Sequence, residues 1–179
     1  MRLDGIIAKD LNAPYTAGKR KFAWIKLKKS YGKTMDTVDA LIVGYYRGKG
    51  ARTEFGFGGL LVAVYNEKKE RFETIAKVGS GFTEEEMGKF AEELGKMKTK
   101  NAPADLDYKM EPDFWVKPKR VVEIAYDNIT KSPVHTCGEE EGKGFALRFP
   151  RLVRLRDDKG PYDVTTTKEI REMYKEEGG

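Results

Sequence analysis

The stretch Phe57-Gly-Gly-Leu-Leu-Val-Ala-Val-Tyr65 decides the fold, together with Phe72–Val78 and the sequence Thr83-Glu-Glu-Glu86 that follow it. The first two segments are rich in Val, Ile, Phe and Tyr and are separated by a turn of Asn, Glu and Lys, which is typical of neighbouring β-strands. Thr83 with a Glu three residues later forms a capping box and predicts the start of a helix. Apolar residues then recur at helical spacing and predict that this helix plugs a barrel core: Met87, Phe90, Ala91, Leu94 and Met97.

The same patterns extend along the chain in both directions. A short helix is predicted from Thr166, because Thr166 and Glu169 repeat the capping pattern. Three strands, a helix and further strands is the order of a five-stranded Greek-key barrel, which commonly holds nucleic acid on its open face. The fold class is therefore mainly β with a minor α part. The other strands are predicted from β-branched and aromatic residues at 22–28, 38–46, 115–116, 121–126, 145–149 and 152–155.

The composition describes a globular protein with a charged surface. Of the 179 residues, 39% are hydrophobic and 35% are charged, which argues against global disorder and against a membrane protein. The amino end has no secretory pattern, and we expect a cytoplasmic protein. One cysteine cannot form an internal disulfide, and Cys137 with the single His135 cannot fill a tetrahedral zinc site.

The positive charge is concentrated near the two ends of the chain. Residues 1–33 contain nine Lys and Arg against two Asp, a local charge of +7 in a chain whose net charge is +5. Residues 148–159 contain five cations against Asp157 and Asp158. Cations that neutralise phosphates release condensed counterions, so two basic strips indicate a polyanionic partner. The alternative is that both strips are solvated surface that only keeps the protein soluble.

The first basic segment has the chemistry of a phosphate site. Residues alternate within 22–28, so Lys26 and Lys28 share one face of the predicted strand about 7 Å apart, which suits a di- or triphosphate. Asp4 offers the hard oxygen ligands that magnesium prefers. The alternative for the two lysines is an exposed strand face without a ligand. The polar stretch Ser30–Thr37 separates this segment from the barrel, and we predict a hinge there.

Several short sequences resemble a known family. Asp4-Gly-Ile-Ile-Ala-Lys9 and Trp24-Ile-Lys-Leu-Lys-Lys-Ser-Tyr31 resemble the fourth and fifth signature boxes of ATP-dependent DNA ligases, within the nucleotidyltransferase superfamily. Phe57–Ala63 and Ala76–Phe82 are similar to the OB-fold domain of these enzymes, and Leu147–Lys159 is similar to their sixth box. The order and spacing of these boxes match over almost the whole chain, and most closely match the archaeal replicative ligases.

The resemblance implies an OB-fold barrel preceded by the last strands of an adenylation domain. The implied divisions are 1–33 for the end of the adenylation domain, 34–160 for the OB-fold domain and 161–179 for a C-terminal tail with a short helix. Asp4 would lie near the metal and the adenylate, where the family more often has Glu. Nucleotide contacts are implied for Arg20, Lys26 and Lys28. The sixth box would orient the leaving pyrophosphate or contact DNA through Arg148, Arg151, Arg154, Arg156, Asp158 and Lys159.

The family seals nicks in duplex DNA, in replication, repair and recombination, through a lysyl-adenylate and a DNA-adenylate, with ATP and Mg²⁺. Its nucleophile is the lysine of a Lys-x-Asp-Gly box, and no such tetrapeptide occurs in the 179 residues. We therefore interpret the chain as the C-terminal part of a ligase that is inactive by itself. The expected partners are nicked duplex DNA, the N-terminal part of the enzyme and, as a further candidate, a sliding clamp.

Other interpretations stay open at this stage. The chain can be a stand-alone OB-fold module that binds nucleic acid without catalysis, or a relative of the RNA-capping guanylyltransferases, which share the boxes. His135 and Cys137 are two residues apart and would share one face of a strand, but nothing nearby would orient a catalytic dyad, so packing is the favoured role. Packing is also favoured over base stacking for Trp24 and Trp115.

Overall fold

A computed structural model describes residues 5–14, 24–28 and 36–178 of the chain. The protein divides into two compact units, Met1–Met35 and Asp36–Gly179. Asp4 and Arg20, two of the predicted site residues, lie outside the described residues. Among the helices that are described, none is long and apolar enough to cross a membrane.

The first unit contains an antiparallel hairpin. Strand β1 (Gly5–Lys9) pairs with β2 (Trp24–Lys28) along the full length of both strands. Three isoleucines of this hairpin, Ile6, Ile7 and Ile25, are 61%, 55% and 49% exposed. A two-stranded hairpin is marginally stable by itself. Exposed apolar side chains on such a hairpin favour contact with another surface that covers them.

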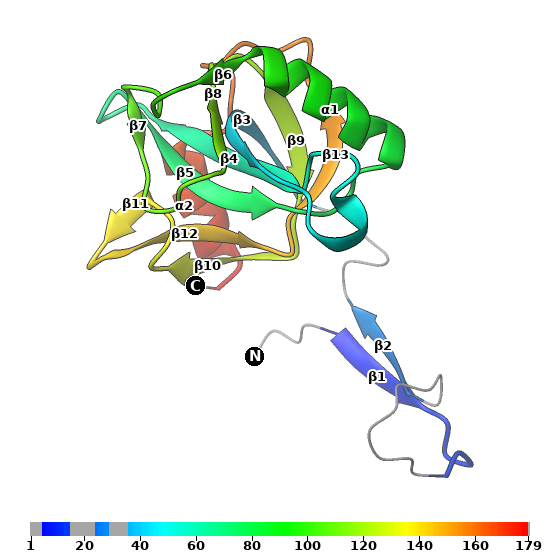
Figure 1. Cartoon of the computed structure of the whole chain (residues 1–179). Coiled ribbons are helices and arrows are strands. Elements are labelled where there is room, and N and C mark those ends of the chain that lie inside the picture. The colour runs from blue at the N-terminus through cyan, green and yellow to red at the C-terminus, as the bar shows by residue number, and fades with distance from the viewer. Residues whose placement is uncertain (1–4, 15–23, 29–35, 179) are drawn as a thin grey trace. The chain divides into compact units, whose positions relative to one another are not determined.

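Five strands of the second unit close into a barrel (Figure 1). They lie in the order β13-β9-β3-β4-β5, and each neighbouring pair is antiparallel. The barrel closes where Ser80, just after β5, pairs in parallel with Arg151, and the amide of Leu152 donates to the carbonyl of Ser80 over 2.9 Å. This is the Greek-key OB-fold that the sequence predicts. The strands are β3 (Thr37–Tyr46), β4 (Gly59–Asn66), β5 (Arg71–Val78), β9 (Val121–Ala125) and β13 (Arg151–Leu155).

Helix α1 (Glu84–Lys96) follows β5 and packs its apolar face against the barrel core. The predicted capping box is present, because the Thr83 hydroxyl accepts from the Glu86 amide and the Glu86 carboxylate accepts from the Thr83 amide over 2.8 Å. The buried residues of the helix are Met87, Phe90 and Leu94. The prediction of a helix that plugs the barrel is confirmed.

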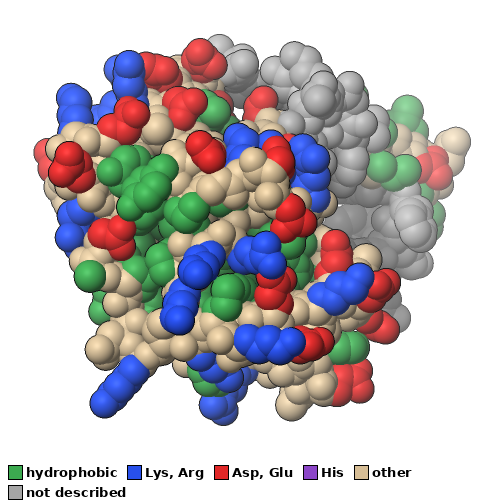
Figure 2. Space-filling model, turned by 90° about the horizontal axis from the view of Figure 1, so that it is seen from above, with side chains coloured by type: hydrophobic (Ala, Val, Ile, Leu, Met, Phe, Trp, Pro, Cys, Tyr) green, Lys and Arg blue, Asp and Glu red, His purple; other side chains and the backbone are tan. Residues whose placement is uncertain are grey.

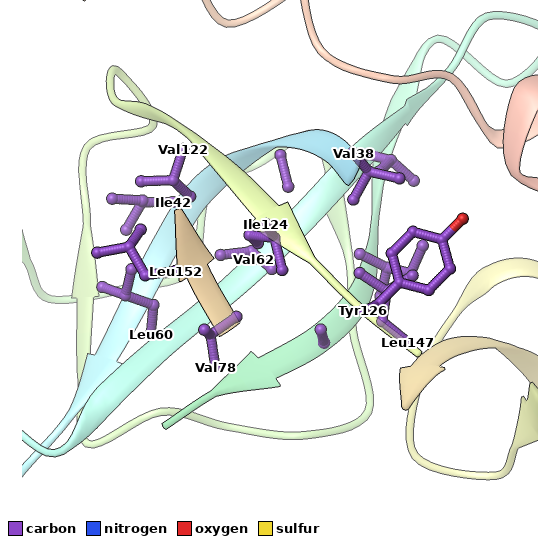
Figure 3. Packing of buried hydrophobic residues seen from close by; sticks show 14 of the residues in the cluster. Val38, Ile42, Leu60, Val62, Val78, Val122, Ile124, Tyr126, Leu147 and Leu152 are labelled. Carbon is purple, nitrogen blue, oxygen red and sulfur yellow. The ribbon is translucent and has the colours of Figure 1, made fainter. Parts of the chain in front are cut away.

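The barrel core is made by the inward side chains of all five strands. Figure 3 shows them converging from different strands: Val38 and Ile42 (β3), Leu60 and Val62 (β4), Val78 (β5), Val122 and Ile124 (β9), and Leu152 (β13). Strand β3 is buried on both sides, because Leu41 and Val43 face a second apolar cluster outside the barrel. This burial explains why the sequence of β3 is almost continuously apolar rather than alternating.

A small second sheet and a C-terminal helix pack beside the barrel (Figure 1). The sheet has the order β10-β12-β11, and the capping box at Thr166 that predicts the helix is confirmed. Strands β8 (Phe114–Val116) and β12 (Lys143–Arg148) correspond to the strands predicted at 115–116 and 145–149, and helix α2 (Thr167–Glu176) corresponds to the helix predicted from Thr166. The sequence patterns missed the shorter elements, because they have two to five residues and are mostly polar. The missed elements are η2 (Gly50–Arg52), β6 (Lys98–Thr99), β7 (Leu106–Asp107), β10 (Asn128–Ser132) and β11 (Cys137–Glu140).

One buried carboxylate fastens the small sheet and α2 to the barrel. Glu73 of β5 is 0% exposed, and its Oε2 accepts from the Gly138 amide and from the Thr167 hydroxyl, each over 2.8 Å. Its Oε1 accepts from the Lys69 ammonium over 2.9 Å and from the Asn66 side-chain amide over 3.0 Å. Buried charges are stable only when they are paired and hydrogen-bonded, and these four donors satisfy that requirement. The helix predicted as a tail is thus an integral part of the second unit.

Candidate phosphate and nucleic-acid interface

The predicted site residues fall on both units. Lys26 and Lys28 are alternate residues of β2, as predicted. Asp4 and Arg20 lie outside the described residues, and the other predicted residues, all described, lie between the end of β12 and the loop after β13. We call this segment, residues 148–159, the cation strip.

The cation strip begins at a sharp turn between β12 and β13. Phe149 has a φ of 52°, a left-handed conformation that is uncommon for a residue other than glycine, and its side chain is 57% exposed. Arg148 lies over the Phe149 ring, with 5.1 Å between its guanidinium carbon and the ring centroid. Arg151 donates to Asp127 over 2.8 Å and to the Phe149 carbonyl over 2.9 Å. The turn therefore presents an aromatic ring between two arginines at the surface.

Arg154 lies beyond the turn on the solvent side of β13. A register shift between Leu152 and Arg154 brings Arg154 opposite Glu123 of β9. Its Nε donates to the Glu123 carboxylate over 2.6 Å, and this hydrogen bond lowers the pKa of Glu123 below its ordinary value. The Arg154 side chain is 60% exposed, whereas Glu123 is 17% exposed. Arg154 can thus turn toward a ligand in solvent.

Arg156 is held by carboxylates on more than one side. Its Nε and Nη2 donate to the two oxygens of Asp158 over 2.9 and 2.7 Å, which is a bidentate pair. Its Nη1 donates to Oδ1 of Asp39 on β3 over 3.0 Å. The same fork lowers the pKa of Asp158, and Asp158 raises the pKa of the Arg156 guanidinium. Lys159 donates from its Nζ to the other oxygen, Oδ2, of Asp39 over 2.8 Å.

The strip is therefore less basic in the fold than its sequence suggests. Arg154, Arg156 and Lys159 are balanced by three acids within ion-pair distance, namely Asp158 of the strip itself and two acids from neighbouring strands, Asp39 and Glu123. Arg151 is likewise paired with Asp127. Of the four arginines in the strip, Arg148 is the one for which the described residues provide no carboxylate. On the face shown in Figure 2, basic and acidic side chains are likewise interspersed around apolar surface.

Sequence patterns missed the two acids that organise the strip. Asp39 and Glu123 are each the single acid in an otherwise apolar strand, Thr37–Tyr46 and Val121–Ala125. A lone acid in an apolar strand is a usable signal, because buried charges need partners. Which cations pair with these acids depends on strand register, which the sequence patterns do not give.

A second basic segment was also missed. The loop between β3 and β4 carries Arg47, Lys49 and Arg52, and loops at this position of OB-folds commonly contact oligonucleotides. Arg47 lies 4.8 Å from the centroid of the Phe114 ring, and Lys98 lies 3.8 Å from it. Cations beside an aromatic ring are a surface chemistry that suits nucleic acid.

The structure corrects the expectation that His135 and Cys137 share a strand face, because β11 begins only at Cys137. Both side chains are buried, and the Cys137 thiol lies 3.9 Å from the Thr167 hydroxyl. Burial raises the pKa of the Cys137 thiol and lowers the pKa of His135 to about 4, so the thiol and the neutral imidazole are the favoured forms. A nucleophile needs a thiolate, so this pair has the chemistry of packing. Trp115 packs at the edge of the second apolar cluster, with its ring 4.7 Å from Tyr108.

Metal ligands do not gather in the described part of the chain. Across residues 5–14, 24–28 and 36–178, no group of three or more His, Cys, Asp or Glu side chains is arranged to hold a metal ion. Asp158, the acid predicted in the sixth box, is already occupied by Arg156.

Comparison with known proteins gives one family match over most of the second unit. Residues 52–159 match the model for the C-terminal region of ATP-dependent DNA ligases. This range contains the whole cation strip and four of the five barrel strands.

Curated relatives match nearly the whole chain. A probable DNA ligase of Dictyoglomus turgidum is 55% identical over 97% of this chain, and DNA ligase 1 of Methanosarcina acetivorans is 45% identical over 96% of it. The chain spans 30% of the length of each of these relatives.

Two solved ligase structures are also similar to the chain. The crystal structure of the ligase domain from M. tuberculosis LigD has 28% identity and a TM-score of 0.53, covering 90% of this chain and 47% of that one. A mycobacterial DNA ligase D complexed with ATP and MES has 26% identity and a TM-score of 0.51, covering 89% of this chain and 46% of that one.

Proposed function

The chain belongs to the ATP-dependent DNA ligase family, because it matches the C-terminal region of these enzymes, and from this membership we propose that it serves the nick-sealing reaction of such an enzyme. Its part is to supply cations for the phosphates of ATP and a surface for nicked duplex DNA. The observation that carries the proposal is the family match over residues 52–159, which contains every residue of the cation strip.

The first task is the departure of pyrophosphate from ATP. Negative charge builds on the leaving β- and γ-phosphates as the adenylate forms on a lysine, and fixed cations lower the energy of that state. Arg154 and Lys159 suit this role, because they are 60% and 30% exposed. Lys26 and Lys28, together with Arg20, would contact the nucleotide from the first unit.

The second task is the contact with DNA. Arg148 and Phe149 stand at the surface of the turn before β13, and Arg47, Lys49 and Arg52 line the loop after β3. Lys and Arg that meet phosphates give affinity that is independent of sequence, as a nick-sealing enzyme needs. The barrel would therefore bind the duplex through its backbone and place the nick for sealing.

The nucleophilic lysine would come from outside this chain. No Lys-x-Asp-Gly tetrapeptide occurs in its sequence, so we expect the chain alone to form no lysyl-adenylate. The N-terminal part of a ligase would supply that lysine. Mg²⁺ would be held through Asp4 and the phosphates themselves.

Binding of nicked duplex DNA tests the proposal. We expect the chain to bind a nicked duplex with an affinity that falls steeply with salt concentration, since phosphate contacts release counterions. Replacing Arg148 by Ala should reduce the slope of log affinity against log salt by about 1. The matched control is Lys89→Ala, which removes an exposed cation on α1 that is paired with Glu85. Binding that does not depend on salt, or equal slopes for the two variants, would contradict the role of the strip.

A further inference from the structure

Two acids lie next to the cation strip, although acids repel phosphate and a phosphate site would be expected to lack them. Asp39 of β3 and Glu123 of β9 are directly opposite in the register of two antiparallel strands. Both side chains are 17% exposed, so solvent screens their charges only weakly. Like charges directly opposite on neighbouring strands destabilise a sheet. Their position becomes favourable only because cations of the strip, Arg154, Arg156 and Lys159, lie against them.

On the basis of the proposed function, we propose that Asp39 and Glu123 hold the cations of the strip while no phosphate is bound, and compete with polyphosphate for those cations. The two carboxylates thus substitute internally for the phosphate oxygens of the ligand. They keep the cation side chains ordered, and they determine how strongly a ligand must bind these cations to replace the carboxylates.

The contacts of Asp39 resemble those of a phosphate group. Each of its oxygens holds a different cation, with Oδ1 3.0 Å from Arg156 Nη1 and Oδ2 2.8 Å from Lys159 Nζ. The Arg156 side chain is 14% exposed, and Asp158 occupies its other edge. A phosphate therefore competes with carboxylate oxygens for Arg156, whereas Lys159 is 30% exposed and can meet a phosphate while Asp39 still reduces its net charge. Arg154 is different, because its exposed side chain can swing out from Glu123 on its own.

This arrangement selects for ligands with several phosphates. Arg154, Arg156 and Lys159 and the three acids around them sum to zero formal charge, so this group of side chains attracts a single phosphate weakly. When the cations turn from the acids to a ligand, the negative charges of Asp39 and Glu123 are left opposite each other without a neutralising cation, and their repulsion opposes ligand binding. A triphosphate or pyrophosphate offers enough charge to overcome this cost, whereas a monophosphate offers less. The class of ligand is thus a polyphosphate chain rather than an isolated phosphate.

A binding experiment with the complete 179-residue chain tests this competition. Inorganic tripolyphosphate is titrated by calorimetry into the unaltered chain, into Asp39→Asn and into Asp157→Asn. Asp157 is the matched control, because it loses the same charge close by but pairs with Arg120 rather than with the three cations. We expect Asp39→Asn to bind about fivefold more tightly than the unaltered chain, as the loss of one nearby negative charge implies, and Asp157→Asn to differ by less than about twofold. Equal or weaker binding by Asp39→Asn than by Asp157→Asn overturns the inference.

A second measurement uses only the unaltered chain, so it does not depend on whether a variant folds. In the unaltered chain, the Nε–H resonance of Arg156 should shift on addition of tripolyphosphate, and inorganic phosphate at the same ionic strength should shift it less. An unmoved Arg156 resonance at saturating tripolyphosphate overturns the inference. If the chain binds nicked duplex with the expected salt dependence while Asp39→Asn leaves tripolyphosphate affinity unchanged, the competition fails and the proposed function stands. If the chain binds neither tripolyphosphate nor nicked duplex, both fail.

Discussion

Replacing Glu73 by Ala should destabilise the second unit strongly, although the residue is far from any predicted site in sequence. The side chain is fully buried and accepts four hydrogen bonds. Two of its donors, the Lys69 ammonium and the Asn66 amide, can turn to water, because Lys69 is half exposed and Asn66 is the partly exposed last residue of β4. The other two, the Gly138 amide and the Thr167 hydroxyl, are buried and would be left without an acceptor.

The size of the stability loss follows from these two buried donors that lose their acceptor. Each buried donor that loses its partner costs about 1–3 kcal/mol, and removing the buried carboxylate itself returns part of this sum. We therefore expect a loss of about 3 kcal/mol in the free energy of unfolding, which corresponds to a fall in melting temperature of roughly 10 °C for a domain of this size. Glu73→Gln should lose less, since one oxygen can still accept a hydrogen bond.

Urea and thermal unfolding followed by circular dichroism measure this effect. Glu67→Ala, which alters an exposed acid in the same β4–β5 turn, is the matched control and should change the free energy of unfolding by less than about 0.5 kcal/mol. An Ala variant of Glu73 within 1 kcal/mol of the unaltered chain would refute the view that this carboxylate fastens α2 and the small sheet to the barrel.

Three further predictions concern stability and reactivity. Burial lowers the pKa of His135 to about 4, below its value near 6.5 in the unfolded chain, so between these pH values the unfolded chain binds one more proton than the folded chain. The free energy of unfolding should therefore be highest above pH 6.5 and fall by up to about 3 kcal/mol toward pH 4. The C2–H resonance of the single histidine should titrate near pH 4 rather than 6.5. Gly88 lies inside α1 with open space around its α-carbon, so Gly88→Ala should raise the free energy of unfolding by about 1 kcal/mol in urea titrations, and a decrease would contradict the packing of that helix. Cys137 is buried with a raised pKa, so a thiol reagent should label the native chain only at the rate of unfolding, and rapid labelling at neutral pH would show that the small sheet is open.

Local patterns were sufficient for the barrel itself. The predicted strands 57–65 and 72–78 and the capping boxes at Thr83 and Thr166 depend on neighbours within a few residues, and the structure confirms them as β4, β5 and the starts of α1 and α2. Strand β10, Asn128-Ile-Thr-Lys-Ser132, was missed because it is polar and forms only through pairing with β12. Local propensity contains no information about such a partner.

The sequence shows the cations of the candidate site but not the acids that neutralise them. The cations of 148–159 are visible in the sequence, whereas Asp39 and Glu123, two of the acids that neutralise them, lie more than 30 residues away along the chain. Asp39 lies 117 residues before Arg156, and Glu123 lies 31 residues before Arg154. Only the register of β3, β9 and β13 brings them together. Counting charges along a sequence therefore overestimates the positive potential of a strip that its own fold partly neutralises.

Transfer of a radiolabelled adenylyl group in trans tests the central claim most directly. An N-terminal ligase part that contains a Lys-x-Asp-Gly box is incubated with α-labelled ATP and Mg²⁺, with and without this chain, and covalent label is counted on each polypeptide. If this chain supplies cations for pyrophosphate departure, the label appears on the N-terminal part and rises at least tenfold when the chain is added, and Arg154→Ala lowers that rise. Label on this chain itself, or equal labelling of the N-terminal part with and without it, would contradict the account.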